Sequence, residues 1–599
     1  MINDNTLKSI FSKKDVCMLF ETCRPDNQNK TTYLFSKPVK SLISYDRASA
    51  EKALEELEIL IKNKYWIAGY FSYELGYGFE KDSFPVECKY KFPLLELYAF
   101  EKPEKSRTLK KDLPAGQKGI KVGGIKFNIP FEKYGKNIAK IKHYIEKGDV
   151  YQINYTGKLK FTASRDPFLF YRGLTEKQPV PYSAFLKFKD KTVISLSPEL
   201  FFSVKNGIIE SKPMKGTMNR GRDSAEDAAK MRELSKSGKN RAENIMITDL
   251  IRNDLGRICK TGSIVTSDIY EVQKYNTLLQ MITTVRGRLK KGATWKEIFK
   301  SIFPGGSITG APKIRAMQII RELEKEDRKV YCGALGFISP DNNAVFSIPI
   351  RTILLEKNKG EMGIGSGIVY DSKAGEEYEE ALLKAKFLTE KTADFKLIET
   401  MLWDKKYILL IGHLKRLEKS AGYFNFARDM KNIAGRLKAE EKKFIRGGKY
   451  KIRLLLSRTG NPEIFVSEYI PGSSKKENVV ISKQRVNSAD RYLYHKTTIR
   501  DLYEKEREKI KNKNIFDVIF LNEKAEITEG AVTNIFILRD GKYFTPPVSS
   551  GLLPGVYRDY MIKKKKAVQK VLKIKDLKMA DKVYLVNSVR GIVEVSIKY

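Results

Sequence analysis

Apolar and polar residues alternate along the first 390 positions with two different periods. Apolar residues recur at helical spacing near 48–63, at 131–147 and at 239–257. Shorter apolar runs have the length of strands, as at Val150–Tyr155, and Trp66–Tyr77 alternates aromatic with small residues like a buried strand that enters a turn. The pattern therefore predicts a chain that contains both amphipathic helices and buried strands.

Two glycine clusters interrupt this pattern. The run Phe303–Lys313 precedes a helical pattern at 314–323, so its amides could lie near a helix N-terminus and receive an anion. The run Gly363–Val369 is typical of a strand whose glycines leave main-chain N–H groups open to a carboxylate. Neither run matches a Walker A or dinucleotide fingerprint, because the first lacks the Gly-Lys-Ser/Thr ending and the second lies deep in a strand pattern.

Length and charge limit the classes of function. The chain has 599 residues, 42% of them hydrophobic, which is enough for at least two large folded domains. Its formal net charge of +40 would suit nucleic acid, an anionic membrane surface or acidic small molecules. The lysines are interleaved with glutamates, as at 504–509, and no zinc-finger, basic-zipper or aromatic RNA-binding pattern accompanies them. We therefore expect no nucleic-acid partner.

Cysteine usage and the N-terminal residues bear on the compartment. The five cysteines are scattered without CxxC spacing, which argues against a disulfide framework or a zinc site and favours a reducing compartment. The first residues lack the charged and apolar segments of a signal peptide, and no apolar run reaches the roughly 18 residues of a membrane span. We expect a cytoplasmic protein with no membrane partner.

Lys215 is the main candidate for chemistry in the first half of the chain. It lies in the segment Pro213–Thr217, beyond a strand pattern at 200–204, where stiff backbone would hold it. Burial, or neighbouring cations, would lower its pKa and make the free amine available to attack carbon. Glu199 and Glu243 are two carboxylates that could flank it. The alternative interpretation is that Lys215 is one of many surface lysines.

A pair of carboxylates marks a candidate metal site on a later helix. Glu377, Glu380 and Lys384 stand at i, i+3 and i+7 of a helical pattern. Two acidic groups one turn apart could help to hold Mg²⁺, which prefers carboxylate oxygens and keeps several waters. The alternative is a surface ion pair between Glu380 and Lys384, worth only about 0.2–0.5 kcal/mol. Arg351 could supply a bidentate clamp for a carboxylate.

Taken in order, these motifs resemble the chorismate-utilising enzymes, and within that family the component I branch of the aminodeoxychorismate synthases. The resemblance covers most of residues 1–390 and implies an α+β chorismate-utilising-enzyme fold, in which a β-sheet sandwich core is flanked by helices. It rests on the segments Gly69–Glu74, Gly148–Asn154, Ser197–Glu199, Pro213–Thr217, Arg241–Asn244, Asp249–Asp254, Phe303–Lys313, Ile350–Thr352 and Gly363–Asp371.

The resemblance implies a role for each candidate residue. The amine of Lys215 would add at C2 of the chorismate ring as the C4 hydroxyl leaves, and ammonia would then enter at C4 and expel the lysine. Glu199 would protonate the departing hydroxyl. Glu243 and Glu380, with Glu377 nearby, would hold Mg²⁺. The substrate would be bound by Arg351, Lys384, Gly365, Ser366, Gly367, Thr309 and Gln280.

Two positions distinguish this chain within the family. Lys215 is typical of the aminodeoxychorismate branch, because relatives that make anthranilate or isochorismate usually carry a small residue there. Gln280 stands where anthranilate synthases and some close relatives have a histidine, and its amide cannot titrate. Lys215 therefore argues against the alternative of an anthranilate synthase component I fused to a class IV aminotransferase.

A second pattern begins where the first ends and is too long to be an appendage. His413–Leu417 falls on a helical pattern, and Tyr494–Arg500 places Lys496 beside two hydroxyls. With Ile527–Phe536 and Gly551–Arg558, in this order and spacing, the segments resemble the class IV pyridoxal-phosphate enzymes, and among them aminodeoxychorismate lyase. The resemblance implies a D-amino-acid-aminotransferase-like α/β fold with two subdomains.

This second resemblance implies pyridoxal 5'-phosphate as a cofactor. Lys496 would be the Schiff-base lysine and proton carrier, Arg416 a phosphate ligand, and Glu529 the partner of the pyridinium nitrogen. A carboxylate at that nitrogen keeps it protonated, so that the cofactor can act as an electron sink. Val556 and Tyr557 stand where many relatives have Ile-Thr, so backbone amides would supply part of the phosphate contact. Further cofactor contacts would come from Thr533 and Asn534.

Together the two resemblances imply consecutive steps toward folate. Residues 1–392 would convert chorismate and ammonia to aminodeoxychorismate, and residues 393–599 would eliminate pyruvate to leave 4-aminobenzoate. We find no segment that supplies a glutaminase, so ammonia would come from a separate glutamine amidotransferase subunit or from solution. A homodimer through the second domain is a further expectation. A basic nucleic-acid-binding protein with a degenerate enzyme fold is the alternative from another class.

Overall fold

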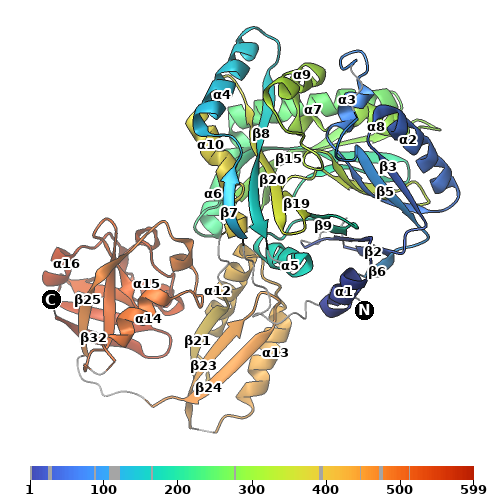
Figure 1. Ribbon diagram of the computed structural model, residues 1–599. Helices are drawn as coiled ribbons and strands as arrows, with labels where there is room; N and C mark the ends of the chain where they lie inside the picture. Colours follow the sequence, from blue (N-terminus) through green and yellow to red (C-terminus); the bar gives the residue numbers. More distant parts are fainter. Residues whose placement is uncertain are drawn as a thin grey trace. The chain divides into compact units, whose positions relative to one another are not determined.

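The structure is a computed structural model, and its fold divides into two compact units (Figure 1). Unit 1 comprises Met1–Asn219 and Arg232–Thr392, and unit 2 comprises Arg220–Met231 and Ala393–Tyr599. The structure describes residues 3–23, 30–85, 89–106, 122–163, 166–275, 278–389, 395–445, 447–470, 477–511 and 513–598. Cys88 and the predicted domain boundary at 392/393 lie outside these ranges.

Unit 1 is built on two antiparallel sheets, A and B. Sheet A contains, in spatial order, β16 (Gly310–Ala311), β8 (Gln152–Ala163), β20 (Lys359–Ile368), β19 (Thr352–Glu356), β10 (Thr192–Ser197), β9 (Tyr182–Lys187), β1 (Cys17–Glu21), β2 (Thr32–Ser36) and β6 (Glu104–Ser106), with β7 (Val122–Phe127) also paired to β8.

Sheet B begins at the strand that carries Lys215. Its spatial order is β13 (Met214–Asn219), β15 (Leu278–Arg288), β12 (Ile208–Lys212), β11 (Leu200–Lys205), β18 (Ala344–Ser347), β17 (Ala334–Ile338), β4 (Trp66–Phe71), β5 (Leu95–Phe100) and β3 (Lys40–Ser44), with β14 (Val265–Lys274) paired to β15.

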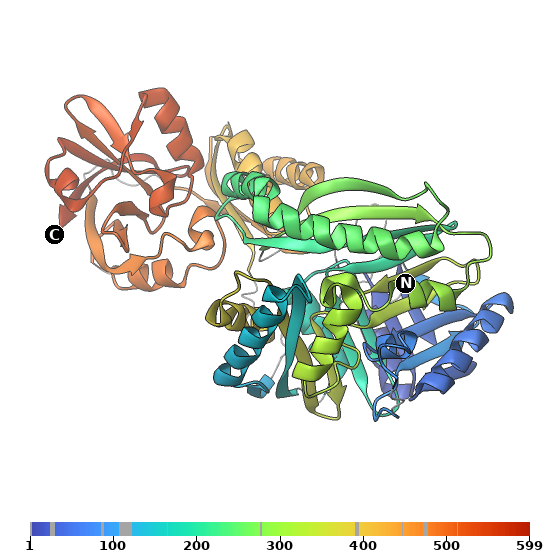
Figure 2. The same ribbon diagram turned by 90° about the horizontal axis from the view of Figure 1, so that it is seen from above.

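Helices cover these sheets. An apolar stripe explains their placement, as in α2, which buries Ala50, Leu54, Leu57 and Ile61 behind a capping box at Asp46. Figure 2 shows the long helix α7, which packs against β13 and β15. The helices of unit 1 are α1 (Asp4–Lys13), α2 (Arg47–Lys62), α3 (Leu75–Phe79), α4 (Phe131–Glu146), α5 (Pro167–Lys177), α7 (Gly238–Ile258), α8 (Trp295–Ile302), the short 3₁₀ turn η2 (Gly306–Ile308), α9 (Lys313–Leu323), α10 (Ala374–Leu383) and α11 (Lys386–Thr389).

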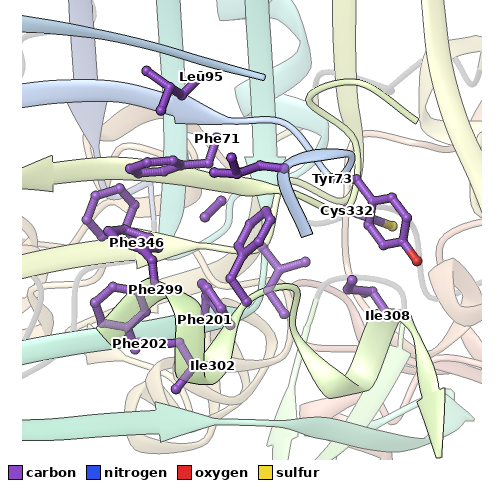
Figure 3. Close-up of a cluster of buried hydrophobic side chains, with 14 of the residues drawn as sticks. Phe71, Tyr73, Leu95, Phe201, Phe202, Phe299, Ile302, Ile308, Cys332 and Phe346 are labelled. Carbon is purple, nitrogen blue, oxygen red and sulfur yellow. The ribbon is translucent and has the colours of Figure 1, made fainter. Parts of the chain in front are cut away.

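Three apolar cores hold unit 1 together in layers. One core lies between the two sheets and joins Met18 of β1 to Tyr70 of β4. A second lies between sheet B and the helices α2, α8 and α9, where the rings of Phe71 and Phe299 are 4.1 Å apart (Figure 3). A third lies between sheet A and helices α1 and α5. Unit 1 is therefore a sandwich of two sheets flanked by helices, as the sequence predicted.

The local predictions for unit 1 hold with two differences. The helices expected at 48–63, 131–147, 239–257 and 314–323 are α2, α4, α7 and α9. Helix α1 was not expected. Lys215 lies within a strand, β13, whereas the sequence placed it only beyond the strand pattern at 200–204. Strands β6 and β7 precede and follow residues 107–121, which lie outside the described ranges.

Unit 2 contains two subdomains, each with its own sheet and core. The smaller sheet contains β22 (Lys406–Tyr407), β21 (Leu397–Asp404), β23 (Lys449–Leu456) and β24 (Pro462–Glu468), and the larger contains β27 (Ile527–Gly530), β26 (Asp517–Asn522), β25 (Glu477–Val486), β32 (Gly591–Lys598), β31 (Lys582–Asn587), β28 (Asn534–Arg539), β29 (Lys542–Thr545) and β30 (Val568–Gln569).

The helices of unit 2 cover both sheets. Helix α6 (Ser224–Lys236) begins in the Arg220–Met231 segment of this unit. None of the described helices in either unit is long and apolar enough to cross a membrane. The remaining helices are α12 (Leu410–Tyr423), α13 (Met430–Glu441), α14 (Asp501–Glu508), α15 (Val556–Lys565), α16 (Ile574–Lys578), and the 3₁₀ turns η3 (Arg491–Tyr494) and η4 (Val548–Ser550).

Candidate active sites

Lys215 lies on β13, an edge strand of sheet B, at a break in its pairing. The register with β15 shifts between Met214 and Thr217, and Gly216 has a φ of +88°. Such a bulge turns a side chain away from the regular alternation of the strand. The amine reaches β20 of sheet A, because a methyl group added at Gly367 would come within 3.3 Å of Lys215 Nζ.

Four charged side chains from three parts of unit 1 act on this amine. Burial lowers the pKa of Lys215, and Lys384 lowers it further. Glu199, Glu243 and Glu380 oppose that shift, because each carboxylate favours the charged ammonium. The structure therefore brings together five residues that the sequence singled out. A lowered pKa leaves more of the lysine as the free amine, which is the form that attacks carbon.

Glu199 is a buried carboxylic acid beside this lysine. Its side chain is 4% exposed. Burial raises its pKa to about 7, although hydrogen bonds from Ser307 and the backbone of Met214, and the charge of Lys215, favour the ionised form. Ser307 Oγ donates to Glu199 Oε1 at 2.7 Å. Near neutral pH Glu199 can therefore carry a proton and give it up.

Arg351 and Lys384 are the two cations that the sequence predicts as contacts for a carboxylate. Lys384 Nζ donates to the carbonyl of Gly365 at 2.8 Å and forms an ion pair with Glu380 at 2.9 Å. Arg351 has the left-handed φ of +53°, and burial lowers its pKa to about 10. Its Nη1 atom has no hydrogen-bond partner among the described residues, so it is available to a ligand.

The glycines of β20 allow two backbones to approach closely. A methyl group at Gly365 would clash with the carbonyl of Tyr155, and one at Gly367 would clash with the side chain of Gln152. Ser366 between them is 2% exposed. This arrangement explains why glycine is needed at both positions and leaves their main chain uncovered by side chains of their own.

Thr309 and Gln280 already have partners within the protein. Thr309 is fully buried, and its hydroxyl donates to the carbonyl of Gly305 at 3.0 Å. Gln280 Oε1 accepts a hydrogen bond of 3.4 Å from Thr217. A substrate contact from either residue would therefore compete with, or add to, these bonds.

The expected metal ligands form a sparse set. Glu243 and Glu380 both influence Lys215, and Glu377 accepts a hydrogen bond from Ser372 at 2.7 Å. Among the residues that the structure describes, no group of three or more His, Cys, Asp or Glu could hold a metal ion. Mg²⁺ is commonly held by one or two carboxylates together with substrate oxygens and waters. The carboxylates present fit Mg²⁺ only as a site that the substrate completes.

Lys496 lies in a separate cavity of about 300 Å³ in unit 2. Its carbonyl accepts a hydrogen bond from the Ile398 amide at 2.8 Å, which ties it to the strand β21. Burial lowers the pKa of Lys496 to about 7, and the charges of Arg416, Arg500 and Arg453 act in the same direction. The amine is therefore divided between its charged and neutral forms near neutral pH.

Arg416 is oriented by a carboxylate that the sequence did not single out. Its Nε and Nη2 atoms donate to Glu399 at 3.0 and 2.7 Å, and His413 Nδ1 lies 2.6 Å from the same carboxylate. Burial acts to raise the pKa of Glu399, but Arg416 and His413 hold it at about 2. The Nη1 atom of Arg416 donates to Pro554 at 3.3 Å. The guanidinium is thus fixed at the wall of the cavity.

Glu529 is a buried carboxylate on β27 that lines the same cavity. It accepts hydrogen bonds from the hydroxyl of Tyr503 at 3.0 Å, Nδ2 of Asn534 at 3.1 Å and the amide of Leu553 at 3.1 Å. Burial raises its pKa to about 7, although Arg500 and these hydrogen bonds favour the ionised form. The hydroxyl of Thr533 donates to Asp517 at 2.8 Å.

Val556 and Tyr557 begin helix α15 at the cavity wall. Gly555 precedes them as the N-cap residue, and a methyl group there would clash with Asn534. The free N–H groups at a helix N-terminus bind phosphate. The cavity therefore combines a lysine amine, a buried carboxylate and an anion-binding helix end, and this donor set fits pyridoxal phosphate.

Several neighbours of these residues were not predicted from the sequence. Ser307 lies in the glycine cluster at 303–313, and its hydroxyl is a hydrogen-bond donor that could have marked it as a partner of a carboxylate. Glu399 lies seventeen positions from Arg416 without any local pattern that links them. Arg453 and Arg500 add charge near Lys496 and also gave no local signal.

Comparison with known proteins gives two family matches. The model of the chorismate binding enzymes matches residues 16–390. The model of the class IV amino-transferases matches residues 396–597. These matches confirm the fold class predicted for each part of the chain.

Individual relatives match the first part. Aminodeoxychorismate synthase of Streptomyces pristinaespiralis is 42% identical over 254 residues, which are 42% of this chain and 35% of that protein. Anthranilate synthase component 1 of Acetivibrio thermocellus is 40% identical over 258 residues, which are 43% of this chain and 52% of that protein. The crystal structure of anthranilate synthase component I from Streptococcus pneumoniae TIGR4 is similar, with a TM-score of 0.53, 26% identity and coverage of 61% of this chain and 93% of that one. The chain spans about half or less of the length of the first two relatives.

Proposed function

The chain belongs to the family of chorismate binding enzymes, and from that premise we propose that it makes 4-aminobenzoate in two steps. Residues 1–392 aminate chorismate to 4-amino-4-deoxychorismate, and residues 393–599 convert that product to 4-aminobenzoate and pyruvate. The observation that carries the proposal is Lys215, a buried amine of lowered pKa beside the protonatable acid Glu199.

The first step exchanges a hydroxyl for an amine. Lys215 Nζ forms a bond to C2 of the ring while the C4–O bond breaks, and Glu199 gives its proton to the departing oxygen, which leaves as water. Ammonia then bonds to C4 while the C2–N bond breaks, which restores Lys215. The lowered pKa of Lys215 favours the free amine that acts as the nucleophile, and the raised pKa of Glu199 favours the protonated acid, so both reactive forms can be present at the same pH.

Substrate binding in the first step depends on the remaining charged groups. Arg351 and Lys384 bind carboxylate oxygens, with main-chain groups of Gly365–Gly367 beside them. Glu243 and Glu380, with Glu377 nearby, would hold Mg²⁺. That ion would neutralise the ring carboxylate, since hard cations prefer oxygen ligands.

The second step uses the cavity around Lys496. Pyridoxal phosphate, when bound there, supplies an electron sink. Arg416 and the N-terminus of α15 would hold its phosphate, and Glu529 would keep the ring nitrogen protonated. Lys496 has a pKa of about 7, so it can take a proton from the substrate carbon and return one during the elimination of pyruvate. Formation of the aromatic ring drives the release.

Ammonia and assembly are further parts of the proposal. The relative from Acetivibrio thermocellus is named a component 1, which supports a separate second component. We therefore propose that ammonia comes from a glutamine amidotransferase subunit or from solution. A cytoplasmic location and a homodimer through residues 393–599 complete the proposal.

Product identification tests the function. Purified protein is incubated with chorismate, ammonium and Mg²⁺, with and without pyridoxal phosphate. The proposal requires 4-aminobenzoate and pyruvate with the cofactor, and aminodeoxychorismate without it. Formation of anthranilate would support the anthranilate synthase alternative. Absence of turnover together with nucleic-acid binding that survives physiological salt would support a degenerate enzyme fold.

A further inference from the structure

A short segment from the first half of the sequence is part of unit 2. Residues Arg220–Met231 belong to the same compact unit as Ala393–Tyr599. They follow β13 directly in the chain and lie between the candidate residues Lys215 and Glu243 in sequence.

A buried ion pair stabilises the segment. Arg220 Nε donates to both carboxylate oxygens of Asp227, at 2.9 and 3.0 Å, and the side chains are only 4% and 1% exposed. The amide of Gly221 donates to the same carboxylate at 2.9 Å. Breaking such a pair by removing one charge is costly, because the other is left buried and unpaired. Asp227 therefore holds the turn at 220–222 in one conformation.

The segment contacts Tyr423, the last residue of α12, through a cation–π interaction and two hydrogen bonds. The Arg220 guanidinium lies 4.5 Å from the centre of the Tyr423 ring, and its Nη2 donates to the Tyr423 carbonyl at 3.1 Å. The Tyr423 hydroxyl donates to the carbonyl of Gly221 at 2.6 Å. The Tyr423 ring in turn stacks on His495, with 4.4 Å between ring centres.

His495 is held on three sides. Burial lowers its pKa to about 4, so the ring is neutral near pH 7. Its Nε2 lies 3.3 Å from the carbonyl of Arg222, which can only accept, so Nε2 carries the proton. Nδ1 then accepts from the hydroxyl of Ser420 at 2.9 Å. The Arg222 guanidinium also lies 4.9 Å from the centre of the Tyr494 ring.

We propose that the segment Arg220–Met231 positions Lys496 in its cavity. Tyr494 and His495, the two residues before Lys496, are held by this segment, and the carbonyl of Lys496 itself is held by Ile398. The backbone on both sides of the amine is thus fixed. No residue of the segment lines the cavity around Lys496, so the segment acts through His495. The catalytic meaning of this role rests on the proposed function of residues 393–599.

The first test removes the charge of Asp227 in the full-length chain. In Asp227→Asn we expect a changed pH midpoint for labelling of Lys496 by an amine reagent without cofactor. After addition of pyridoxal phosphate, we expect altered absorbance and a rate from supplied aminodeoxychorismate to 4-aminobenzoate that is lower by roughly 10–100-fold. The matched control is Glu508→Gln, which removes an exposed ion pair with Lys511 in the same unit and should change none of these readouts.

A milder variant keeps the test decisive if Asp227→Asn does not fold. Tyr423→Phe removes the hydroxyl bound to Gly221 and keeps the ring that stacks on His495. We expect faster hydrogen exchange at 220–222 and at 494–496. The pH midpoint for labelling of Lys496 should shift less than in Asp227→Asn. Faster exchange at 220–222 with unchanged labelling and absorbance would overturn the inference. If wild-type protein made no 4-aminobenzoate, the proposed function would fail, but cofactor-free labelling would still decide the positioning role.

Discussion

Ser307 donates a hydrogen bond to the carboxylate of Glu199 at 2.7 Å, across 108 positions of sequence. The bond favours the ionised carboxylate, while burial favours the protonated acid and raises the pKa to about 7. Burial is the larger of the two effects. The acid–base state of the proposed synthase site therefore depends on a pair of residues that no local motif joins.

This pair predicts how amination depends on pH. Glu199 must carry a proton to act as an acid, so the rate should fall as pH rises through about 7. Ser307→Ala removes a donor to the ionised form, which raises the pKa and should move the falling limb to higher pH. The measurement is kcat/KM for chorismate at a constant concentration of free ammonia. A limb that moves to lower pH would contradict the assignment.

Glu199→Gln should separate activity from stability. We expect amination to fall by about 10²–10⁴-fold, because the proton donor is lost. A carboxyl whose folded pKa is raised from 4.5 to about 7 destabilises the folded state once pH exceeds the unfolded value, and fully above about 7. At pH 8 the variant should therefore gain stability, on the order of 3 kcal/mol. Chemical unfolding at pH 8 and at pH 4 checks the sign, since the gain should vanish at pH 4.

The two lysines should affect different steps. Lys215→Ala should lose chorismate amination by about 100-fold or more and retain conversion of supplied aminodeoxychorismate. Lys496→Ala should show the reverse pattern, with aminodeoxychorismate accumulating from chorismate. Separate assays of the two half-reactions make the comparison. Equal loss of both half-reactions in either variant would be incompatible with one lysine for each step.

Glu399 should control the charge state of Lys496. Its carboxylate raises the pKa of Lys496 against burial and the three arginines. In Glu399→Gln, labelling of Lys496 by an amine reagent in cofactor-free protein should therefore begin at lower pH. The buried Arg416 also loses its partner, which should cost about 3–5 kcal/mol of stability. Labelling that begins at higher pH would show that another charge governs the amine.

Removal of magnesium should stop only the first step. We expect EDTA to abolish chorismate amination and to leave the conversion of aminodeoxychorismate unchanged, because the carboxylates proposed to bind the ion lie in unit 1. Glu243→Gln should raise the Mg²⁺ concentration needed for half-maximal amination. Full amination in metal-free buffer would remove Glu243 and Glu380 from the ligand set.

Local patterns determined a large part of this protein. Helices α2, α4, α7 and α9 follow from apolar spacing, because that periodicity acts within a few turns of one element. Motif order also identified Lys215 and Lys496, since the resemblance to known families is carried by short segments. In this sense fold class and candidate chemistry were present in the sequence alone.

The partners of those residues were decided only by tertiary structure. Helix α1 is held in place by a buried ion pair between Asp4 and Arg172 at 2.8 Å. The residues of the helix do not indicate that Arg172 is the partner. No local pattern indicates that Ser307 contacts Glu199 or that Arg220–Met231 belongs to unit 2. Charges and donors that meet across a hundred or more residues depend on strand register and helix packing, which are properties of the assembled fold. The sequence therefore determined which groups could react, and packing determined their neighbours, their pKa values and their orientation.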